Sequence, residues 1–298
     1  MDERFCDVGD VTLCYETFGE AGDPAVLLVM GLGTQMIAWQ EEFCEELAGR
    51  GFHVIRFDNR DVGRSTHLDH ARPPTRGEIL RRRPRMPPYT LSDMAGDAAG
   101  LLDALGIEAP HVVGASMGGM IAQMMAAEHP DRVLSLVSIM STTGSMWVGQ
   151  PALRLYPFLL RPPPREREAY IEAMVLLFGV IGGSGFQRDE DDLRRLAALS
   201  FERGVNHRGT ERQLGAILAS GDRTGALRRI TAPTLVIHGK SDRLVRPSGG
   251  RATAKTIKGG RVELIEGMGH DLPRGVWPRI IDGIVANAAR AAGDAVPA

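Results

Sequence analysis

The chain has 298 residues, of which 24% are charged, and its formal net charge is −2. This length suits one large α/β domain, with or without an insertion. The near-balanced charge gives no support to a nucleic-acid or other polyanionic partner. We also expect no membrane span.

The first residues, Met1-Asp2-Glu3-Arg4, are acidic and precede no long apolar run, so no secretory signal is expected. The cysteines Cys6, Cys14 and Cys44 lack the spacing of metal ligands and cannot all pair with one another. We therefore expect reduced thiols in a cytoplasmic protein, and no metal or organic cofactor. The sequence leaves open whether the protein is a monomer or a homodimer.

Short apolar runs alternate with helical patterns along most of the chain, which predicts a largely parallel sheet covered on both faces. The alternating segment Val11–Phe18 is expected to begin this sheet as an antiparallel edge strand. Leu91–Leu105 carries one apolar face at helical spacing and stops at Gly106. Further runs predict buried strands at Ala25–Met30, His53–Phe57, His111–Ala115, Leu134–Ile139, Pro233–His238 and Arg261–Glu266.

The alternation breaks in two places. Residues 66–88 hold six arginines and five prolines; this pattern favours a solvated loop or short helix, while gating of the site or binding of an anionic substrate group stays open. Residues 143–225 show helical patterns at Ala169–Phe178, Leu193–Phe201 and Glu211–Leu218. We interpret 143–225 as a helical cap on a core of 1–142 and 226–298, because ordinary crossover helices would not need so long a connection.

The most informative motif is Gly114-Ala115-Ser116-Met117-Gly118, which lies between a predicted buried strand and a helical pattern that stops at His129-Pro130. Strand, sharp turn and helix form the setting that exposes the hydroxyl of a nucleophilic serine. The flanking glycines leave room for the two backbones to approach each other. The alternative is an ordinary glycine-rich turn with an incidental serine.

A nucleophilic serine needs a base, and the base needs an acid that orients it. His270 follows the predicted strand Arg261–Glu266 and is the expected base, whereas the other histidines lie at ends of elements or in irregular segments. Asp242, just past Pro233–His238, is the expected acid. Asp271 is a weaker candidate, because a sequence neighbour of the histidine would orient its ring poorly.

Attack on a carbonyl creates an oxyanion, which requires two backbone N–H donors. One donor is expected from Met117, the residue after the nucleophile. The other is expected from the loop Met30-Gly31-Leu32-Gly33, at Leu32 or an immediate neighbour, because the two glycines let the loop turn an amide inward.

Four blocks carry a family resemblance: Met30–Gly33, Asp58–Ser65, the Ser116 motif and Gly267–His270. With them the whole chain resembles the α/β-hydrolase superfamily, and the order serine, aspartate, histidine is the order of that fold. The resemblance implies a mostly parallel central sheet flanked by helices, with a helical cap inserted after the sixth strand. It also implies a structural role for Asp58–Ser65, whose turn packs near the oxyanion loop in this superfamily.

One detail narrows the resemblance. Most members have His-Gly where this chain has Met30-Gly31, and the branch that contains aclacinomycin methylesterase shares the Met-Gly pair. That branch consists of cap-bearing carboxylic-ester hydrolases. The similarity covers the core well and the cap poorly.

The leading hypothesis is a serine carboxylic-ester hydrolase that acts on a small to medium hydrophobic ester through an acyl-enzyme. A perhydrolase of the cofactor-free haloperoxidase type, or a carbon–carbon bond, lactone or carbamate hydrolase, could use the same three residues. A non-catalytic ligand-binding protein is a further alternative. Haloalkane dehalogenases and epoxide hydrolases need a carboxylate at position 116. Apolar side chains that could contact the substrate include Met146, Trp147 and Phe178, although such residues could equally form the core of the cap.

Overall fold

The computed structural model describes residues 2–155 and 164–293. Its centre is an eight-stranded sheet with the strand order β1-β2-β4-β3-β5-β6-β7-β8. The strands β3 to β8 pair in parallel, while β1 with β2 and β2 with β4 are antiparallel. The strands are β1 (Arg4–Val8), β2 (Val11–Phe18), β3 (Ala25–Val29), β4 (His53–Phe57), β5 (His111–Ala115), β6 (Ser135–Ile139), β7 (Thr234–Gly239) and β8 (Arg261–Ile265).

The N-terminal edge of the sheet differs from the prediction. Val11–Phe18 forms strand β2, but it does not begin the sheet, because β1 precedes it and pairs with it through a turn at Gly9, whose φ is 59°. Most side chains of β1 are exposed to solvent, and Phe5 is 56% exposed. An edge strand with little buried surface lacks the apolar alternation that reveals a strand in sequence, which is why β1 was missed.

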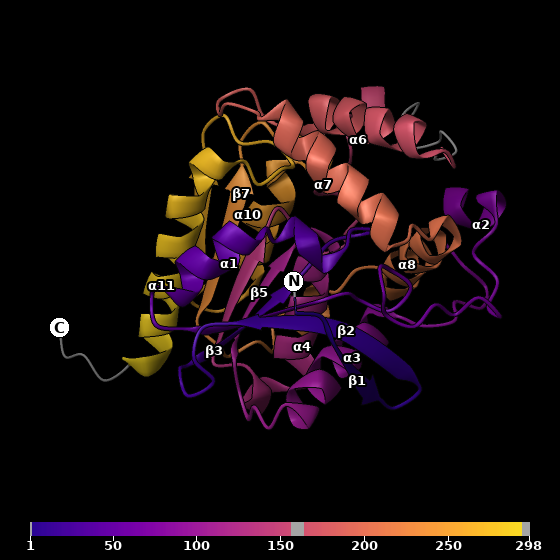
Figure 1. Cartoon of the computed structure of the whole chain (residues 1–298). Coiled ribbons are helices and arrows are strands. Elements are labelled where there is room, and N and C mark those ends of the chain that lie inside the picture. Colours follow the sequence, from indigo (N-terminus) through magenta and orange to yellow (C-terminus); the bar gives the residue numbers. More distant parts are fainter. Residues whose placement is uncertain (1, 156–163, 294–298) are drawn as a thin grey trace.

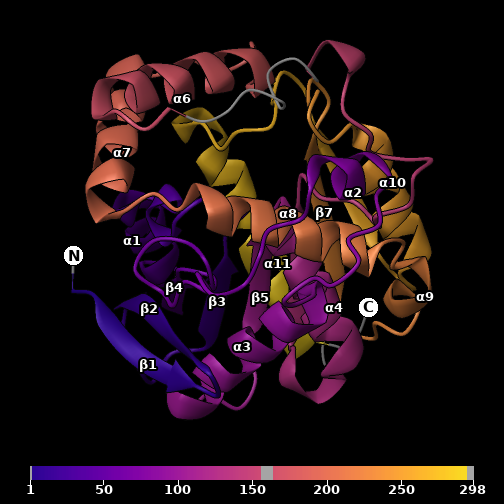
Figure 2. The same ribbon diagram turned by 90° about the vertical axis from the view of Figure 1, so that its right-hand side faces the viewer.

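Helices cover both faces of the sheet (Figures 1 and 2). On one face lie α3 (Leu91–Ala104) and α4 (Met117–Glu128), and on the other lie α1 (Glu41–Ala48) and α11 (Trp277–Ala292). Alternate residues of β3 serve the two cores: Leu27 and Val29 join the first, and Val26 and Leu28 join the second. A parallel strand buried on both faces therefore reads as an unbroken apolar run. A further helix, α10 (Pro247–Thr256), packs against β7 and β8.

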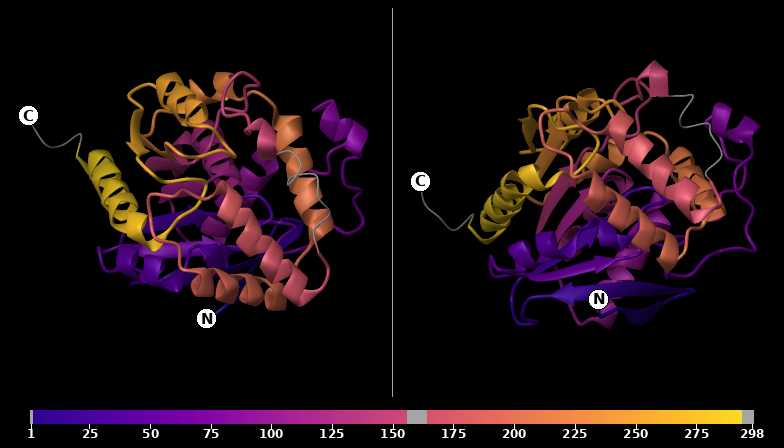
Figure 3. Two further views of the ribbon diagram at one scale, coloured as in Figure 1. Left: turned by 90° about the horizontal axis from the view of Figure 1, so that it is seen from above. Right: turned by 45° about the horizontal axis from the view of Figure 1, so that its top comes forward.

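Between β6 and β7, the described part of the chain contains helices and no strand. The longer ones are α6 (Arg167–Ile181), α7 (Glu190–Arg203) and α8 (His207–Ser220), and the four-residue α9 (Thr224–Leu227) follows. The helices α6 and α7 pack side by side, with the rings of Tyr170 and Phe201 5.7 Å apart, and cross one end of the sheet, at the top of Figure 1 and towards the viewer in Figure 3. Residues 156–163, inside the predicted cap, lie outside the described residues.

The arginine-rich segment contains one short helix, α2 (Arg76–Leu80), which begins with a capping box between Thr75 and Glu78. The Glu78 carboxylate also pairs with Arg72 at 2.8 Å, while most of the remaining arginines point into solvent. The segment thus has the form of an exposed loop with a short helix. Across the described residues, no helix is both long enough and apolar enough to cross a bilayer.

Candidate active site

Ser116 occupies the turn between β5 and α4 in a strained conformation. Its φ of 56° and ψ of −118° lie where residues other than glycine are rare. A Cβ atom at Gly114 would collide with the carbonyl oxygen of Gly118, and one at Gly118 would collide with the carbonyl oxygen of Val29. The turn can be this tight only because both positions are glycine, which is the reason the sequence suggested.

The structure brings together the three side chains predicted to act as one unit. His270 Nε2 lies 3.0 Å from Ser116 Oγ, and His270 Nδ1 lies 2.8 Å from Asp242 Oδ2. Ser116 follows β5, Asp242 follows β7 and His270 follows β8, so all three side chains emerge at the carboxyl end of the parallel strands. At these distances a proton can pass from the hydroxyl to the imidazole without a large movement of either group.

Asp242 is fixed on its other side by the backbone. Its Oδ1 accepts the N–H groups of Leu244 and Val245, both at 2.9 Å. The Asp242 side chain is fully buried, and burial alone would raise the pKa of its carboxyl group. The charges and hydrogen bonds of His270 and His238 outweigh burial and lower the pKa of Asp242 to about 2. Asp242 is therefore an anion throughout the neutral range and can stabilise a cationic imidazole.

Asp271, the weaker candidate for the acid, does not bond to the imidazole. Its Oδ1 accepts the N–H groups of Gly183 at 3.1 Å and Gly269 at 3.2 Å. The backbone N–H of His270 donates to the carbonyl of Ile181 at 2.9 Å. These bonds tie the loop that carries His270 to the end of α6, so Asp271 holds the loop rather than the ring.

The predicted oxyanion loop runs directly against the nucleophile. A Cβ atom at Gly31 would lie 3.1 Å from Ser116 Cβ. The N–H of Gly33 is already bound to Gln213 Oε1 at 2.8 Å, and that of Thr34 is bound to the carbonyl of Gly31 at 3.2 Å. In the part of the chain that the structure describes, the N–H of Leu32 has no intramolecular acceptor, which favours Leu32 over its C-terminal neighbours as the donor. The N–H of Met117 is likewise without an acceptor there.

The three proposed substrate contacts are not joined to Ser116 by any hydrogen bond or ring contact between described residues. Trp147 is 87% exposed and Met146 is 60% exposed. Phe178 lies half-buried on α6, and its carbonyl accepts the N–H of Gly182 near the histidine loop. Contacts of these three side chains with a substrate stay predictions.

The block that follows β4 receives two buried arginines from the helices over the sheet. Arg203 of α7 donates to Asp58 Oδ2 at 2.8 Å, and Arg212 of α8 donates to Asp61 Oδ1 at 2.6 Å. Burial lowers and the Asp58 carboxylate raises the pKa of Arg203, with a net increase. The resemblance implied a structural role for this block, but its partners could not be predicted, because they lie more than a hundred residues away in the sequence.

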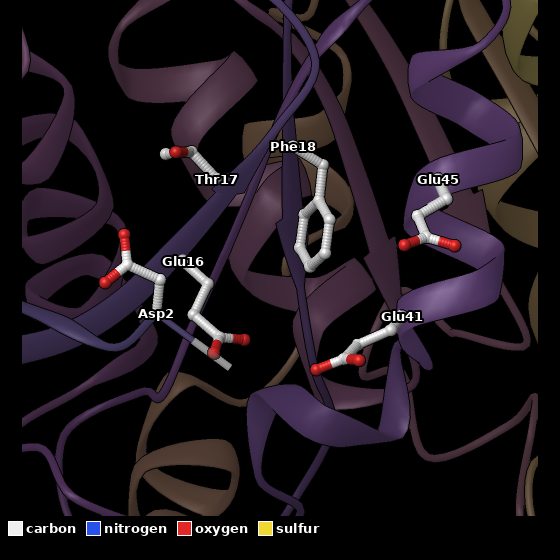
Figure 4. A pocket seen from close by; sticks show the side chains of 6 residues that line it. All are labelled: Asp2, Glu16, Thr17, Phe18, Glu41 and Glu45. Atoms are coloured by element: carbon white, nitrogen blue, oxygen red, sulfur yellow. The ribbon is translucent and has the colours of Figure 1, made fainter.

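A pocket of about 230 Å³ lies elsewhere, between β2 and α1 (Figure 4). None of the predicted site residues lines it. Its walls carry the acidic side chains of Asp2, Glu16, Glu41 and Glu45, and Arg56 contacts Glu16 with Nε at 2.8 Å from Oε2. Among the described residues, no group of three or more His, Cys, Asp or Glu side chains is placed to hold a metal ion.

A mostly parallel sheet that carries a strained serine after β5, an aspartate after β7 and a histidine after β8 defines the α/β-hydrolase class of proteins. The chain belongs to the alpha/beta hydrolase fold family, whose model matches residues 24–273. The predicted fold is thereby confirmed.

Two curated relatives align over nearly the whole chain. Rhodomycin D methylesterase DauP of Streptomyces sp. (strain C5) is 32% identical, covering 96% of this chain and 98% of that protein. Rhodomycin D methylesterase DnrP of Streptomyces peucetius is 30% identical with the same coverage. They confirm the resemblance to methylesterases drawn from Met30-Gly31. The solved structure of the esterase RhEst1 from Rhodococcus sp. ECU1013 has a TM-score of 0.73 at 18% identity, over 97% of this chain and 99% of that one, and this likeness concerns the fold.

Proposed function

We propose that the protein is a serine carboxylic-ester hydrolase that works through an acyl-enzyme. The observation that carries this proposal is the continuous chain of hydrogen bonds from Ser116 Oγ through His270 to Asp242, at 3.0 and 2.8 Å. The full-length similarity to two methylesterases supports an ester, and a methyl ester in particular, as the substrate.

In the first half of the reaction, Ser116 Oγ attacks the acyl carbon while His270 Nε2 takes the hydroxyl proton. The anionic Asp242 stabilises the imidazolium that results, and the N–H groups of Leu32 and Met117 bind the developing oxyanion. The tetrahedral intermediate then collapses. The bond to the alkoxide breaks, the proton on His270 Nε2 passes to the leaving oxygen, and an alcohol is released, which is methanol for a methyl ester.

In the second half, a water molecule replaces the alcohol. His270 takes a proton from the water as its oxygen attacks the acyl-enzyme carbonyl, and the same two N–H groups bind the second oxyanion. Collapse of this intermediate breaks the bond to Ser116 Oγ and returns the proton to it. The products are a carboxylic acid and the regenerated serine, so no external oxidant or reductant is needed.

We further propose that 143–225 acts as a cap that determines which acyl group reaches Ser116. Two features support this division: the helices α6–α8 cross the carboxyl end of the sheet, and β6 and β7, which flank the segment, are paired neighbours. The core is therefore continuous without the segment. We expect a hydrophobic acyl group of small to medium size.

The experiment is covalent labelling with a fluorophosphonate, combined with turnover of p-nitrophenyl acetate and of a panel of methyl esters. Labelling of Ser116 and its loss in S116A, together with loss of turnover and an unchanged circular dichroism spectrum, would support the mechanism. Turnover by S116A near the wild-type rate would overturn it. Lactones and carbamates with the same acyl group test the alternatives: faster hydrolysis of either class than of the esters would replace the ester assignment.

A further inference from the structure

A buried side chain of helix α8 is hydrogen-bonded to the oxyanion loop. Gln213 lies on α8, 180 residues after Gly33 in sequence, and its side chain is fully buried. Its Oε1 accepts the N–H of Gly33 at 2.8 Å, and its Nε2 donates to the carbonyl of Arg60 at 2.8 Å. The amide oxygen accepts from a donor and the amide nitrogen donates to an acceptor, so the orientation of the Gln213 amide is fixed.

We propose that Gln213 is a positioning residue for the oxyanion hole: it holds the Gly31–Gly33 loop so that the N–H of Leu32 points at the carbonyl attacked by Ser116. This inference rests on the proposed function. Gln213 does not touch the reacting atoms, and it acts through the loop.

The loop is held at both ends, which leaves its central amide defined. At one end Gly31 lies against the nucleophile, and the carbonyl of Gly31 accepts the N–H of Thr34. At the other end Gly33 has a φ of 63°, and a Cβ atom there would lie 2.6 Å from Thr210 Oγ1. Helix α8 thus packs against Gly33 through the Thr210 side chain and accepts the N–H of Gly33 through the Gln213 side chain.

Removing the Gln213 amide leaves the buried N–H of Gly33 without an acceptor, which destabilises the loop if it keeps its shape. Rotation of the Leu32–Gly33 peptide towards another acceptor relieves this destabilisation. Such a rotation changes ψ of Leu32 and φ of Gly33, and the shift of the loop that accompanies it displaces the neighbouring Leu32 N–H relative to Ser116. The loss therefore falls on the transition state, where the oxyanion exists, and little on the binding of the uncharged ester.

Helix α8 is itself anchored independently of the loop. Arg212, the residue before Gln213, is fully buried and pairs with the fully buried Asp61. The helix also packs closely on the backbone, since a Cβ atom at Gly209 would collide with the carbonyl oxygen of Asp61. Gln213 is consequently presented from a fixed support, as a positioning residue requires.

The test compares Q213M, Q213E and the matched control E211Q, whose glutamate is exposed on the same helix. We expect kcat for p-nitrophenyl acetate to fall about 10- to 100-fold in Q213M, the scale of a misplacement of roughly 1 Å, with KM changed less than about threefold. The affinity for a trifluoromethyl ketone, whose tetrahedral adduct carries an oxyanion, should fall by the same factor. The E211Q variant should retain both values within about twofold.

Q213E distinguishes positioning from simple packing. It keeps an acceptor for Gly33 but loses the donor to Arg60, so it should retain more activity than Q213M at equal or lower thermal stability. The inference is overturned if Q213M folds and keeps its kcat, or if only its KM changes. It is also overturned if Q213M binds the trifluoromethyl ketone as tightly as the wild type does. If Q213M does not fold, Q213A is used in its place, and a folded Q213E that is no more active than Q213A overturns the inference. Failure of the proposed function has a different signature, namely no esterase activity in the wild type or an active S116A.

Discussion

Replacement of Asp242 by asparagine changes one atom and should nearly abolish turnover. Asp242 Oδ1 accepts two backbone N–H groups at 2.9 Å, from Leu244 and Val245, so the oxygen of an asparagine must remain on that side. Its NH₂ group then faces His270 Nδ1, which in the wild type lies 2.8 Å from a carboxylate oxygen. A donor in this position forces the imidazole into the tautomer with its proton on Nε2, and that nitrogen can no longer accept the proton of Ser116.

The magnitude follows from the two roles that the substitution removes, the tautomer and the anion that stabilises the imidazolium. The same exchange in a serine protease triad lowers kcat about 10⁴-fold, and the hydrogen-bond pattern here is equivalent. A 10⁴-fold loss corresponds to about 5.4 kcal/mol of activation free energy at about 1.36 kcal/mol per tenfold change. KM should change little, because the uncharged ester does not contact Asp242.

The assay is steady-state hydrolysis of p-nitrophenyl acetate, with thermal unfolding measured on the same samples. D271N is the informative companion, because Asp271 is the neighbouring carboxylate and accepts N–H groups from Gly183 and Gly269 instead of the ring. We expect kcat of D271N to remain at least a hundredfold higher than kcat of D242N. A loss below about tenfold in a folded D242N, or a greater loss in D271N, would refute the assignment of Asp242 as the orienting acid.

Two further predictions concern stability and reactivity. R212M should lower the free energy of unfolding by about 3 kcal/mol in urea titrations, because it leaves the buried Asp61 without its cation. The double variant R212M/D61N should recover part of that loss. Equal stability of R212M and the wild type would contradict this prediction. Burial raises the pKa of Cys14 and of Cys44 to about 12, and it raises that of the half-buried Cys6 less. At pH 8, below both values, Ellman's reagent should therefore modify at most one thiol of the native protein, Cys6, and three in urea; rapid native reaction of two would be inconsistent with this burial.

The sequence predicted the parts of the fold that rest on local pattern. The predicted strands appear within about one residue of their expected ends because apolar runs bounded by turns are a local signal. The prediction that Arg261–Glu266 is buried was wrong, because β8 is the edge strand of the sheet and only Ile265 in it is buried. The strained serine was predictable for the same reason, since Gly114 and Gly118 stand beside it in the chain. Asp242 and His270 could be found because each directly follows a recognisable strand. Strand β1 was not found, since its mostly exposed side chains carry no such signal.

The contacts made by α7 and α8 could not be predicted. Arg203, Arg212 and Gln213 are polar residues in amphipathic helical patterns, where the default interpretation is a solvated face. Their burial depends on partners in the block after β4 and in the oxyanion loop, which are more than a hundred residues earlier. The choice of Leu32 over Gly33 as donor has the same origin, because only the bond from Gln213 shows that the N–H of Gly33 is occupied.

These contacts give the Asp58–Asp61 segment a more specific role than a structural turn. Asp58 Oδ1 accepts the N–H of Met36 at 2.7 Å, just beyond the oxyanion loop, while Asp58 Oδ2 accepts Arg203 of α7. Asp61 binds Arg212 of α8. One short segment of the core therefore bonds both to the chain that carries the oxyanion donor and to the helices above it. A displacement of α7 or α8 must break a buried ion pair or move this segment, so the proposed cap and the oxyanion loop are mechanically coupled. Substitutions of the buried α8 side chains that contact this segment or the oxyanion loop, such as Arg212 and Gln213, should consequently alter the rate of the chemical step as well as the choice of substrate.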